Sequence, residues 1–165
     1  MDPKIALLHR ELERAYDRPA WHGPNLRSSL KSITPEIAAW RPGTERHNIW
    51  ELAVHAAYWK YRACRLLSDA APRAFGVKGS NFPPRPVEET EDAWRSDLEL
   101  LQHWHDLLLE AVVSFDPARL GERPGKSDFT FEMLISGVAD HDIYHAGQIR
   151  LIHRLWDDRA RSNPR

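Results

Sequence analysis

Residues 134–152 read LISGVADHDIYHAGQIRLI, a stretch in which apolar residues recur at intervals of three and four. A helix advances about 100° per residue, so residues at these intervals share one face and predict an amphipathic α-helix. The residues of this face are Leu134, Val138, His141, His145, Ile149 and Ile152. The stretch therefore predicts a helix that turns two imidazoles toward the protein interior.

The spacing of His141 and His145 bears directly on metal binding. Side chains at positions i and i+4 of a helix lie one turn apart, which allows two imidazoles to chelate one ion. The chain contains nine histidines, so coincidence explains the spacing alone equally well. An apolar face is an unfavourable place for an imidazole without polar partners, however, and this placement favours a shared ion.

Helical periodicity continues along the chain, and no segment alternates as a half-buried strand would. The predicted helical segments are 2–33, 49–67, 87–115 and 130–156, with a short helix that begins at Pro35. Pro19, Gly23 and Pro24 interrupt the first segment, which is either kinked or two short helices in succession. The predicted fold class is therefore all-α, a four-helix bundle. One domain is expected over 1–165, with a disordered tail at about 158–165.

The helix predicted at 49–67 follows Asn48, a typical N-cap, and has Glu51 at the third helical position, as in a capping box. Its predicted apolar face consists of Leu52, Ala56, Trp59, Ala63 and Leu66. His55 lies at the edge of that face and adds a third inward imidazole. Three imidazoles from two helices leave a coordination position open, which is typical of a catalytic metal site.

The segment 70–86 contains two glycines and four prolines, so it cannot continue a helix. Its seventeen residues span on the order of 50 Å when extended, more than the roughly 30 Å of a twenty-residue helix. A long crossover between the second and third long helices is therefore predicted. The apolar seam of the third long helix consists of Trp94, Leu98, Leu101, His105, Leu108, Val112 and Phe115.

Charge and composition exclude several classes of function. The 165 residues include 23 Lys plus Arg and 24 Asp plus Glu, a formal net charge of −1, whereas a nucleic-acid-binding protein calls for a basic face. No apolar run is long enough for a membrane span, and the N-terminal stretch mixes charged with apolar residues, unlike a signal peptide. The sequence thus predicts a cytoplasmic protein with no nucleic-acid or membrane partner. Cys64 is the single cysteine, so an internal disulfide is excluded.

Three stretches of the sequence together resemble one protein family. They are NIWELAVH at 48–55 followed by Trp59, DHDIYHAGQI at 140–149, and AWHGPNL at 20–26. Their order and spacing resemble the DinB/YfiT-like superfamily of metal-dependent four-helix bundles, over most of the chain. The resemblance implies up-down-down-up connectivity and one divalent ion, often zinc or nickel, bound by residues that match His55, His141 and His145. Imidazole ligands also accept iron or copper.

Members of this family with known activity include thiol-dependent S-transferases and a mycothiol-dependent isomerase, while many others have no assigned reaction. The resemblance therefore implies a metal that lowers the pKa of bound water or of a low-molecular-weight thiol. Cys64 lies about 180° around its helix from His55, so the nucleophile is expected from a small-molecule cosubstrate rather than from Cys64. A metal-dependent hydrolase and a non-catalytic, metal-stabilised interaction module stay open as alternatives. A homodimer is compatible with all three functions.

Residues close to the three histidines are expected to line a pocket. Trp59, Tyr144 and Gln148 lie within about one turn of them, although Trp59 is equally well explained as part of the core. His22 and His47 stand in loops at helix starts. These two histidines are expected either to approach the pocket mouth or simply to be solvated.

His105 falls within the apolar seam of the third long helix. It could act as a fourth ligand, as a group that orients a ligand, or as a general base, but a core histidine bonded to the backbone is the preferred interpretation. Asp142 and Glu51 could orient the ligand imidazoles. Ion pairing or solvent exposure is the more common fate of such helix carboxylates.

Overall fold

The computed structural model describes residues 1–162 and is all-α over that range, which confirms the all-α part of the predicted fold class. The elements are α1 (Pro3–Tyr16), α2 (Leu26–Leu30), α3 (Pro35–Ala39), α4 (Ile49–Leu67), α5 (Glu91–Val113), the 3-10 turn η1 (Pro117–Arg119) and α6 (Phe131–Ser162). The interrupted first segment therefore forms two helices, α1 and α2, rather than one kinked helix. Within the described range, no helix combines the length and the apolar character that a membrane span needs.

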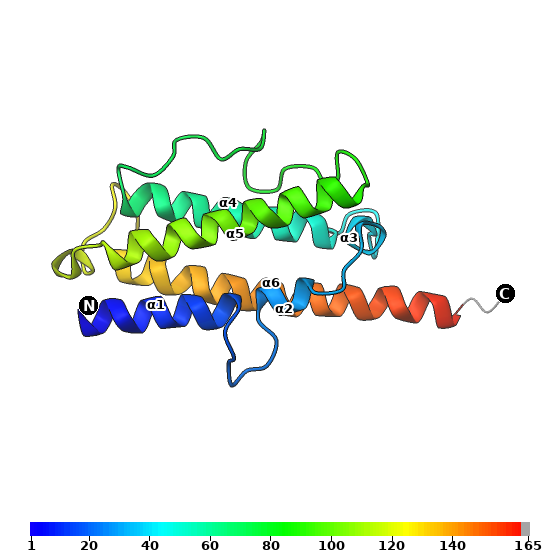
Figure 1. The fold of residues 1–165 in the computed structure, drawn as a ribbon, viewed down its shortest axis with the longest axis horizontal. Helices are drawn as coiled ribbons and strands as arrows, with labels where there is room; N and C mark the ends of the chain where they lie inside the picture. Colours follow the sequence, from blue (N-terminus) through cyan, green and yellow to red (C-terminus); the bar gives the residue numbers. More distant parts are fainter. Residues whose placement is uncertain (163–165) are drawn as a thin grey trace.

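The four long helices α1, α4, α5 and α6 lie side by side (Figure 1). The colours in Figure 1 show that α1 and α6 run in one direction, and that α4 and α5 run in the other. Helix α4 packs against α5 and α6, and α1 packs against the same two helices. The segment between α4 and α5 runs along the outside of this pair and returns the chain to the end where α4 begins (Figure 1).

Local sequence sets most of the helix starts. Asp2, Thr34 and Asn48 each accept a hydrogen bond from a backbone N–H of the first turn, as N-caps do. At α4 the predicted capping box is only half formed. Asn48 Oδ1 accepts a hydrogen bond from the Glu51 N–H at 2.7 Å, but the Glu51 carboxylate binds residues of the preceding loop instead of returning to Asn48.

The predicted boundaries of the third long helix are wrong by a few residues. Helix α5 begins at Glu91 instead of Val87, because the Thr90 hydroxyl caps it by accepting a hydrogen bond from the Ala93 N–H. The helix ends at Val113, two positions before the predicted end. The crossover is correspondingly longer than predicted.

Helix α6 continues to Ser162 instead of ending near Trp156, so the predicted disordered tail is helical as far as that residue. No glycine or proline interrupts the sequence in this part of the helix. The Arg159 guanidinium also lies 3.1 Å above the Trp156 ring and 3.7 Å from the carboxylate of Glu36 on α3. Residues 163–165 of the predicted tail lie outside the described residues.

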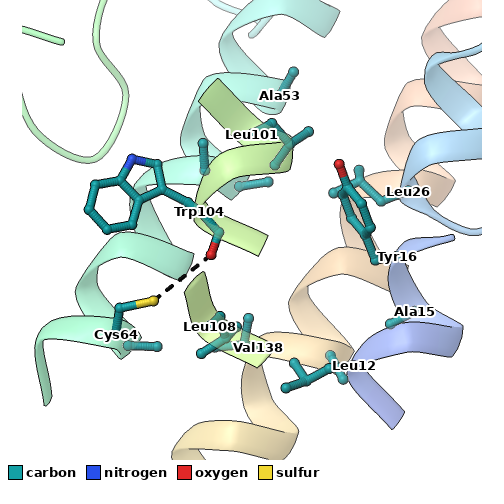
Figure 2. Packing of buried hydrophobic residues seen from close by; sticks show 14 of the residues in the cluster. Leu12, Ala15, Tyr16, Leu26, Ala53, Cys64, Leu101, Trp104, Leu108 and Val138 are labelled. Carbon is teal, nitrogen blue, oxygen red and sulfur yellow. Dashed lines mark hydrogen bonds between the residues drawn. The ribbon is translucent and has the colours of Figure 1, made fainter. Parts of the chain in front are cut away.

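Apolar side chains from all four long helices meet in one core, part of which is drawn in Figure 2. Cys64 belongs to this core, and its thiol donates a weak hydrogen bond to the Trp104 carbonyl at 3.9 Å. Burial raises the pKa of the Cys64 thiol to about 12. A buried, protonated thiol does not act as a nucleophile, in agreement with the expectation that Cys64 plays no such part.

The buried face of α4 differs from the predicted one. Trp59 and Leu66 are each 42% exposed, whereas Lys60 and Cys64 are fully buried. Because α4 packs against both α5 and α6, its buried arc is wider than the stripe of large apolar residues, and it includes a lysine that is paired inside the protein. The spacing of the large apolar residues of α4 therefore does not predict which of its side chains are buried.

Candidate metal site

The three histidines selected from the sequence converge on one point. His55 comes from α4, and His141 and His145 come from α6. His141 Nε2 lies 3.0 Å from His55 Nε2 and 3.0 Å from His145 Nε2, and the three ligand atoms all fall within 4.8 Å of one another. A tetrahedral zinc ion with Zn–N distances of about 2.0–2.1 Å would hold its nitrogens about 3.3 Å apart. The spacing of the three nitrogens therefore fits one divalent ion.

Hydrogen bonds at the far side of two rings direct their Nε2 atoms toward this point. His55 Nδ1 lies 2.9 Å from the Asn81 carbonyl oxygen, which can only accept, so Nδ1 carries the proton and Nε2 keeps its lone pair. His145 Nδ1 lies 2.6 Å from Gln148 Oε1. The Gln148 amide NH2 donates to the Tyr144 hydroxyl at 3.2 Å, which orients Oε1 toward His145. Such partners fix both the tautomer and the ring orientation of metal ligands.

His141 differs from the other two ligand candidates. Its Nδ1 is buried and has no hydrogen-bond partner among the described residues. Asp142, considered from the sequence as an orienting carboxylate, lies in the core with Lys60 and does not reach an imidazole. The ring of His141 is positioned by packing against its neighbours, including edge-on contacts with His145 and Trp59.

Burial keeps the three imidazoles neutral. Desolvation lowers the pKa of His55 to about 4 and that of His141 to about 3, and it also lowers the pKa of His145. The mutual proximity of the imidazoles adds to the effect at His55 and His141, because each would be a like charge to the others when protonated. Neutral imidazoles with accessible lone pairs are the form that binds a metal ion.

The crossover between α4 and α5 supplies one wall of the site. The Phe82 ring stacks on the His55 ring with centroids 3.7 Å apart and planes 6° from parallel. Asn81 adopts a left-handed conformation, with φ 58°, which asparagine tolerates better than most residues. Its side-chain oxygen accepts a hydrogen bond from the Trp59 indole at 3.0 Å. This bond and the one between His55 and the Asn81 carbonyl fasten the crossover to α4.

A cavity of about 810 Å³ adjoins the three histidines. One part of its lining comes from the loop before α4 and includes Glu45, Arg46 and His47. Another part comes from the second half of α6 and includes the apolar side chains of Leu151, Ile152 and Leu155. The site is therefore open to a small molecule that has both polar and apolar groups.

Comparison with known protein families matches residues 20–149 to the DinB superfamily, a range that includes all three histidines. The chain belongs to the DinB superfamily. No curated protein matches the chain, and no solved structure does so either. The family assignment agrees with the resemblance that the sequence motifs predicted.

The residues expected around the ligands of this DinB-superfamily protein fall into two groups. Tyr144 and Gln148 line the cavity, and Gln148 also bonds a ligand imidazole. Trp59 does not line the cavity; its side chain is half-exposed and donates a hydrogen bond to Asn81. His105 and Asp142 lie outside the cavity, in the core.

The structure does not bring His105 to the cavity, where it could act as a ligand or a general base. Its ring stacks on Tyr16, with centroids 3.8 Å apart, on the side of the core formed by α1 and α5. The expected hydrogen bond to a backbone carbonyl is also absent within the described residues, where Nδ1 has no partner. Burial lowers the pKa of His105 to about 2, so a neutral imidazole occupies this position at neutral pH.

Sequence analysis missed Asn81 and Phe82 as parts of the site and left His47 open. Asn81 and Phe82 belong to the irregular crossover, where no periodicity indicates which residues point inward. The proline and glycine content of that segment indicates a loop but not its path. Among the loop histidines, His47 lines the cavity whereas His22 lies elsewhere on the surface.

Proposed function

We propose that this DinB-superfamily protein is a metal-dependent enzyme of the thiol S-transferase type. In this proposal His55, His141 and His145 bind one divalent ion, zinc or nickel, within a four-helix bundle of up-down-down-up connectivity. The observation that carries the proposal is the convergence of three neutral Nε2 atoms beside an open cavity. Structural zinc sites are usually closed by four protein ligands, so three ligands beside a cavity favour catalysis.

When bound, a divalent ion would lower the pKa of a thiol or of water at neutral pH. The residues of the chain would supply the rest of the site. Asn81 and Gln148 hold two ligand rings in the tautomer that offers Nε2. The apolar side chains of the second half of α6 would contact an apolar part of the electrophile.

The nucleophile would come from a low-molecular-weight thiol, because the single cysteine of the chain is buried away from the cavity. Such thiols are kept reduced in the cytoplasm, which is the location that we propose for the protein. The partner is therefore a pair of small molecules, a thiol and an electrophile, rather than a macromolecule.

A metal-dependent hydrolase is the second candidate, because the same three-histidine site could activate water. The half-exposed side chain of His47 lines the cavity and offers the nearby proton-transferring group that a hydrolase needs. The two candidates differ in one respect that an assay can test. An S-transferase requires added thiol, whereas a hydrolase does not.

The proposal is tested first by elemental analysis of protein purified without a histidine tag. The parent is compared with a His55→Ala, His141→Ala double variant and with a matched His22→Ala, His103→Ala control, whose histidines are exposed. We expect about one equivalent of divalent metal in the parent and the control, and little in the site variant. Metal in all three proteins, or in none after reconstitution with zinc and nickel, would contradict the proposal.

The reaction type is then tested with the metal-loaded parent. Electrophiles such as 1-chloro-2,4-dinitrobenzene are mixed with 2-mercaptoethanol or cysteine, and consumption of the electrophile is followed with and without thiol. Thiol-dependent turnover that the site variant lacks would support the transferase. Turnover of ester substrates without thiol would favour the hydrolase instead.

A further inference from the structure

His47 is the fourth histidine that lines the cavity, and it is not one of the three that converge. It immediately precedes Asn48, the N-cap of α4, and its side chain is half-exposed. His47 Nδ1 lies 2.9 Å from Glu51 Oε2, one helical turn farther along the chain. A carboxylate-bound imidazole at the edge of a substrate cavity is a typical arrangement for a group that accepts and donates protons.

Glu51 is a firm anchor for this imidazole. Its side chain is buried, and the Arg41 guanidinium donates to both of its carboxylate oxygens. Although burial raises the pKa of Glu51, the hydrogen bonds from Arg41 and His47 outweigh this effect and hold it below its ordinary value. An ionised carboxylate can only accept, so the proton of neutral His47 lies on Nδ1 and the lone pair lies on Nε2. No described residue forms a hydrogen bond with that Nε2 atom.

The ring of His47 is also fixed relative to the ligands. Phe82 lies between His47 and His55, with centroid distances of 3.8 Å to the first and 3.7 Å to the second. The planes deviate from parallel by only 8° and 6°. The Phe82 ring alone therefore separates the imidazole of His47 from that of His55, one of the three metal-ligand candidates. A small molecule seated against the edge of Phe82 can contact both sides of the stack.

The charged and titratable groups around His47 come from three parts of the chain. Glu51 and His55 lie on α4, and His145 lies on α6. Arg41, Glu45 and Arg46 belong to the same loop as His47, and Arg41 is engaged by Glu51. Among these groups the Glu51 carboxylate is the one bonded to His47, and it would stabilise an imidazolium.

We propose that His47 is the proton acceptor of this site, an inference that rests on the proposed function. When a thiol binds in the cavity, its S–H bond breaks and the electron pair stays on sulfur. The proton forms an N–H bond at Nε2 of His47, directly or through one water, and the resulting imidazolium donates its Nδ1–H to Glu51. The same imidazolium can return the proton to a leaving group or product. In this proposal His47 transfers a proton and does not bind the metal ion.

The experiment counts the protons released when a thiol binds. Cobalt-loaded protein is titrated with 2-mercaptoethanol at about pH 7, where an ordinary imidazole is mostly unprotonated. Calorimetry in two buffers of different ionisation enthalpy gives the number of protons that leave the complex. His47→Gln is compared with the parent, because an amide can still donate to Glu51 and lie flat on Phe82. His22→Gln, a substitution in an exposed loop, is the matched control.

We expect the His47→Gln variant to release more protons than the parent and the control, by up to about one per thiol bound, because it has no acceptor. Thiol affinity should fall in the same variant while cobalt stoichiometry is unchanged. Equal proton counts in the three proteins would overturn the role of His47 and leave the proposed function standing. Failure of the parent to bind cobalt or thiol would overturn the proposed function, and this inference with it.

A second measurement uses the parent alone and does not depend on the folding of any variant. Nitrogen-15 NMR of histidine-labelled protein loaded with zinc reports the protonation of each ring nitrogen. We expect the Nε2 signal of His47 to move from the unprotonated to the protonated range when 2-mercaptoethanol is added. A signal that stays in the unprotonated range at saturating thiol would overturn the inference.

Discussion

The Lys60 ammonium forms an ion pair with the Asp142 carboxylate inside the protein, where neither side chain has any exposed surface. Lys60 lies on α4 and Asp142 on α6, the same two helices that carry the three histidines. Burial raises the pKa of Asp142, and the neighbouring ammonium opposes that effect. Lys60 also lies 5.2 Å from the centroid of the Tyr16 ring, which stacks on His105. Each of the four long helices therefore contributes one residue to a polar layer in the core.

Removing one partner of this pair should destabilise the protein strongly. We expect Lys60→Met to lower the free energy of unfolding by about 3–5 kcal/mol, because it leaves the Asp142 carboxylate buried without its cation. Replacing both residues, with Lys60→Met and Asp142→Leu, should recover most of that loss, since no charge is then left unpaired. Urea unfolding of the metal-free proteins measures both effects. A double variant that is as unstable as the sum of the single variants would contradict this account.

Gln148 should control metal affinity through His145. We expect Gln148→Leu to weaken zinc binding by about 10–100-fold, because it removes the acceptor that orients the His145 ring. Gln148→Glu retains an acceptor and should bind zinc nearly as well as the parent. Competition with a chromogenic chelator gives the affinities. The control is Met133→Leu, an exposed substitution on α6 that lies outside the cavity. Equal affinities for the Gln148→Leu variant and the parent would count against the role of Gln148.

The parts of the fold that depend on local sequence could be predicted. Asp2, Thr34 and Asn48 cap their helices because capping involves only residues within one turn. The apolar seam of α5 is buried along its length, with Leu98 only partly so. The three metal-ligand candidates could be found for the same reason, since helical spacing determines which side chains share a face.

The remaining features depend on tertiary packing, which local spacing does not encode. A lysine in the middle of a helix is usually solvated. The burial of Lys60 follows from its ion pair with Asp142 on α6 rather than from its neighbours in the sequence. Asn81 and Phe82 reach the histidines only because the crossover takes one path among many that its length allows. The sequence does not distinguish His47 from other loop histidines. Its stacking on Phe82 and its hydrogen bond with Glu51 are visible only in the structure.

The conformation of Asn81 should matter for the metal site because its carbonyl oxygen fixes the tautomer of His55. Asn81→Ala places a methyl group at φ 58°, at a cost of about 1 kcal/mol, and removes the acceptor for the Trp59 indole. Asn81→Gly removes the same acceptor but tolerates the conformation. We therefore expect zinc affinity to decrease from the parent to Gly to Ala.

Competition with a chromogenic chelator gives the zinc affinities of the parent, the Asn81→Gly variant and the Asn81→Ala variant. Ser80→Ala, a substitution of the exposed neighbouring residue, is the control. If the alanine and glycine variants bound zinc equally well and as tightly as the parent, the crossover would not position His55. If both were equally weak, the Trp59 bond rather than the backbone conformation would be the important contact.

His105 should make the stability of the protein depend on pH in the acid range. Burial lowers the pKa of His105 to about 2 in the folded protein, whereas an imidazole in the unfolded chain titrates near 6.5. Above that value neither state is protonated, so His105 contributes no pH dependence. Below it the unfolded state binds a proton that the folded state does not, and the folded state loses about 1.4 kcal/mol per pH unit.

This dependence is isolated by comparing the metal-free parent with His105→Phe, which keeps a flat ring against Tyr16 and removes the titrating group. Urea unfolding is measured from about pH 8 to pH 4, a range that brackets the ordinary imidazole pKa. The difference in unfolding free energy should be constant above about pH 7.5 and should then shift in favour of the variant by about 1.4 kcal/mol per unit as the pH falls. The three metal-ligand candidates contribute equally to both proteins and cancel. Parallel curves would mean that His105 takes up a proton in the folded protein. Val113→Thr, an exposed substitution on α5 that removes no titrating group, should give such parallel curves as the control.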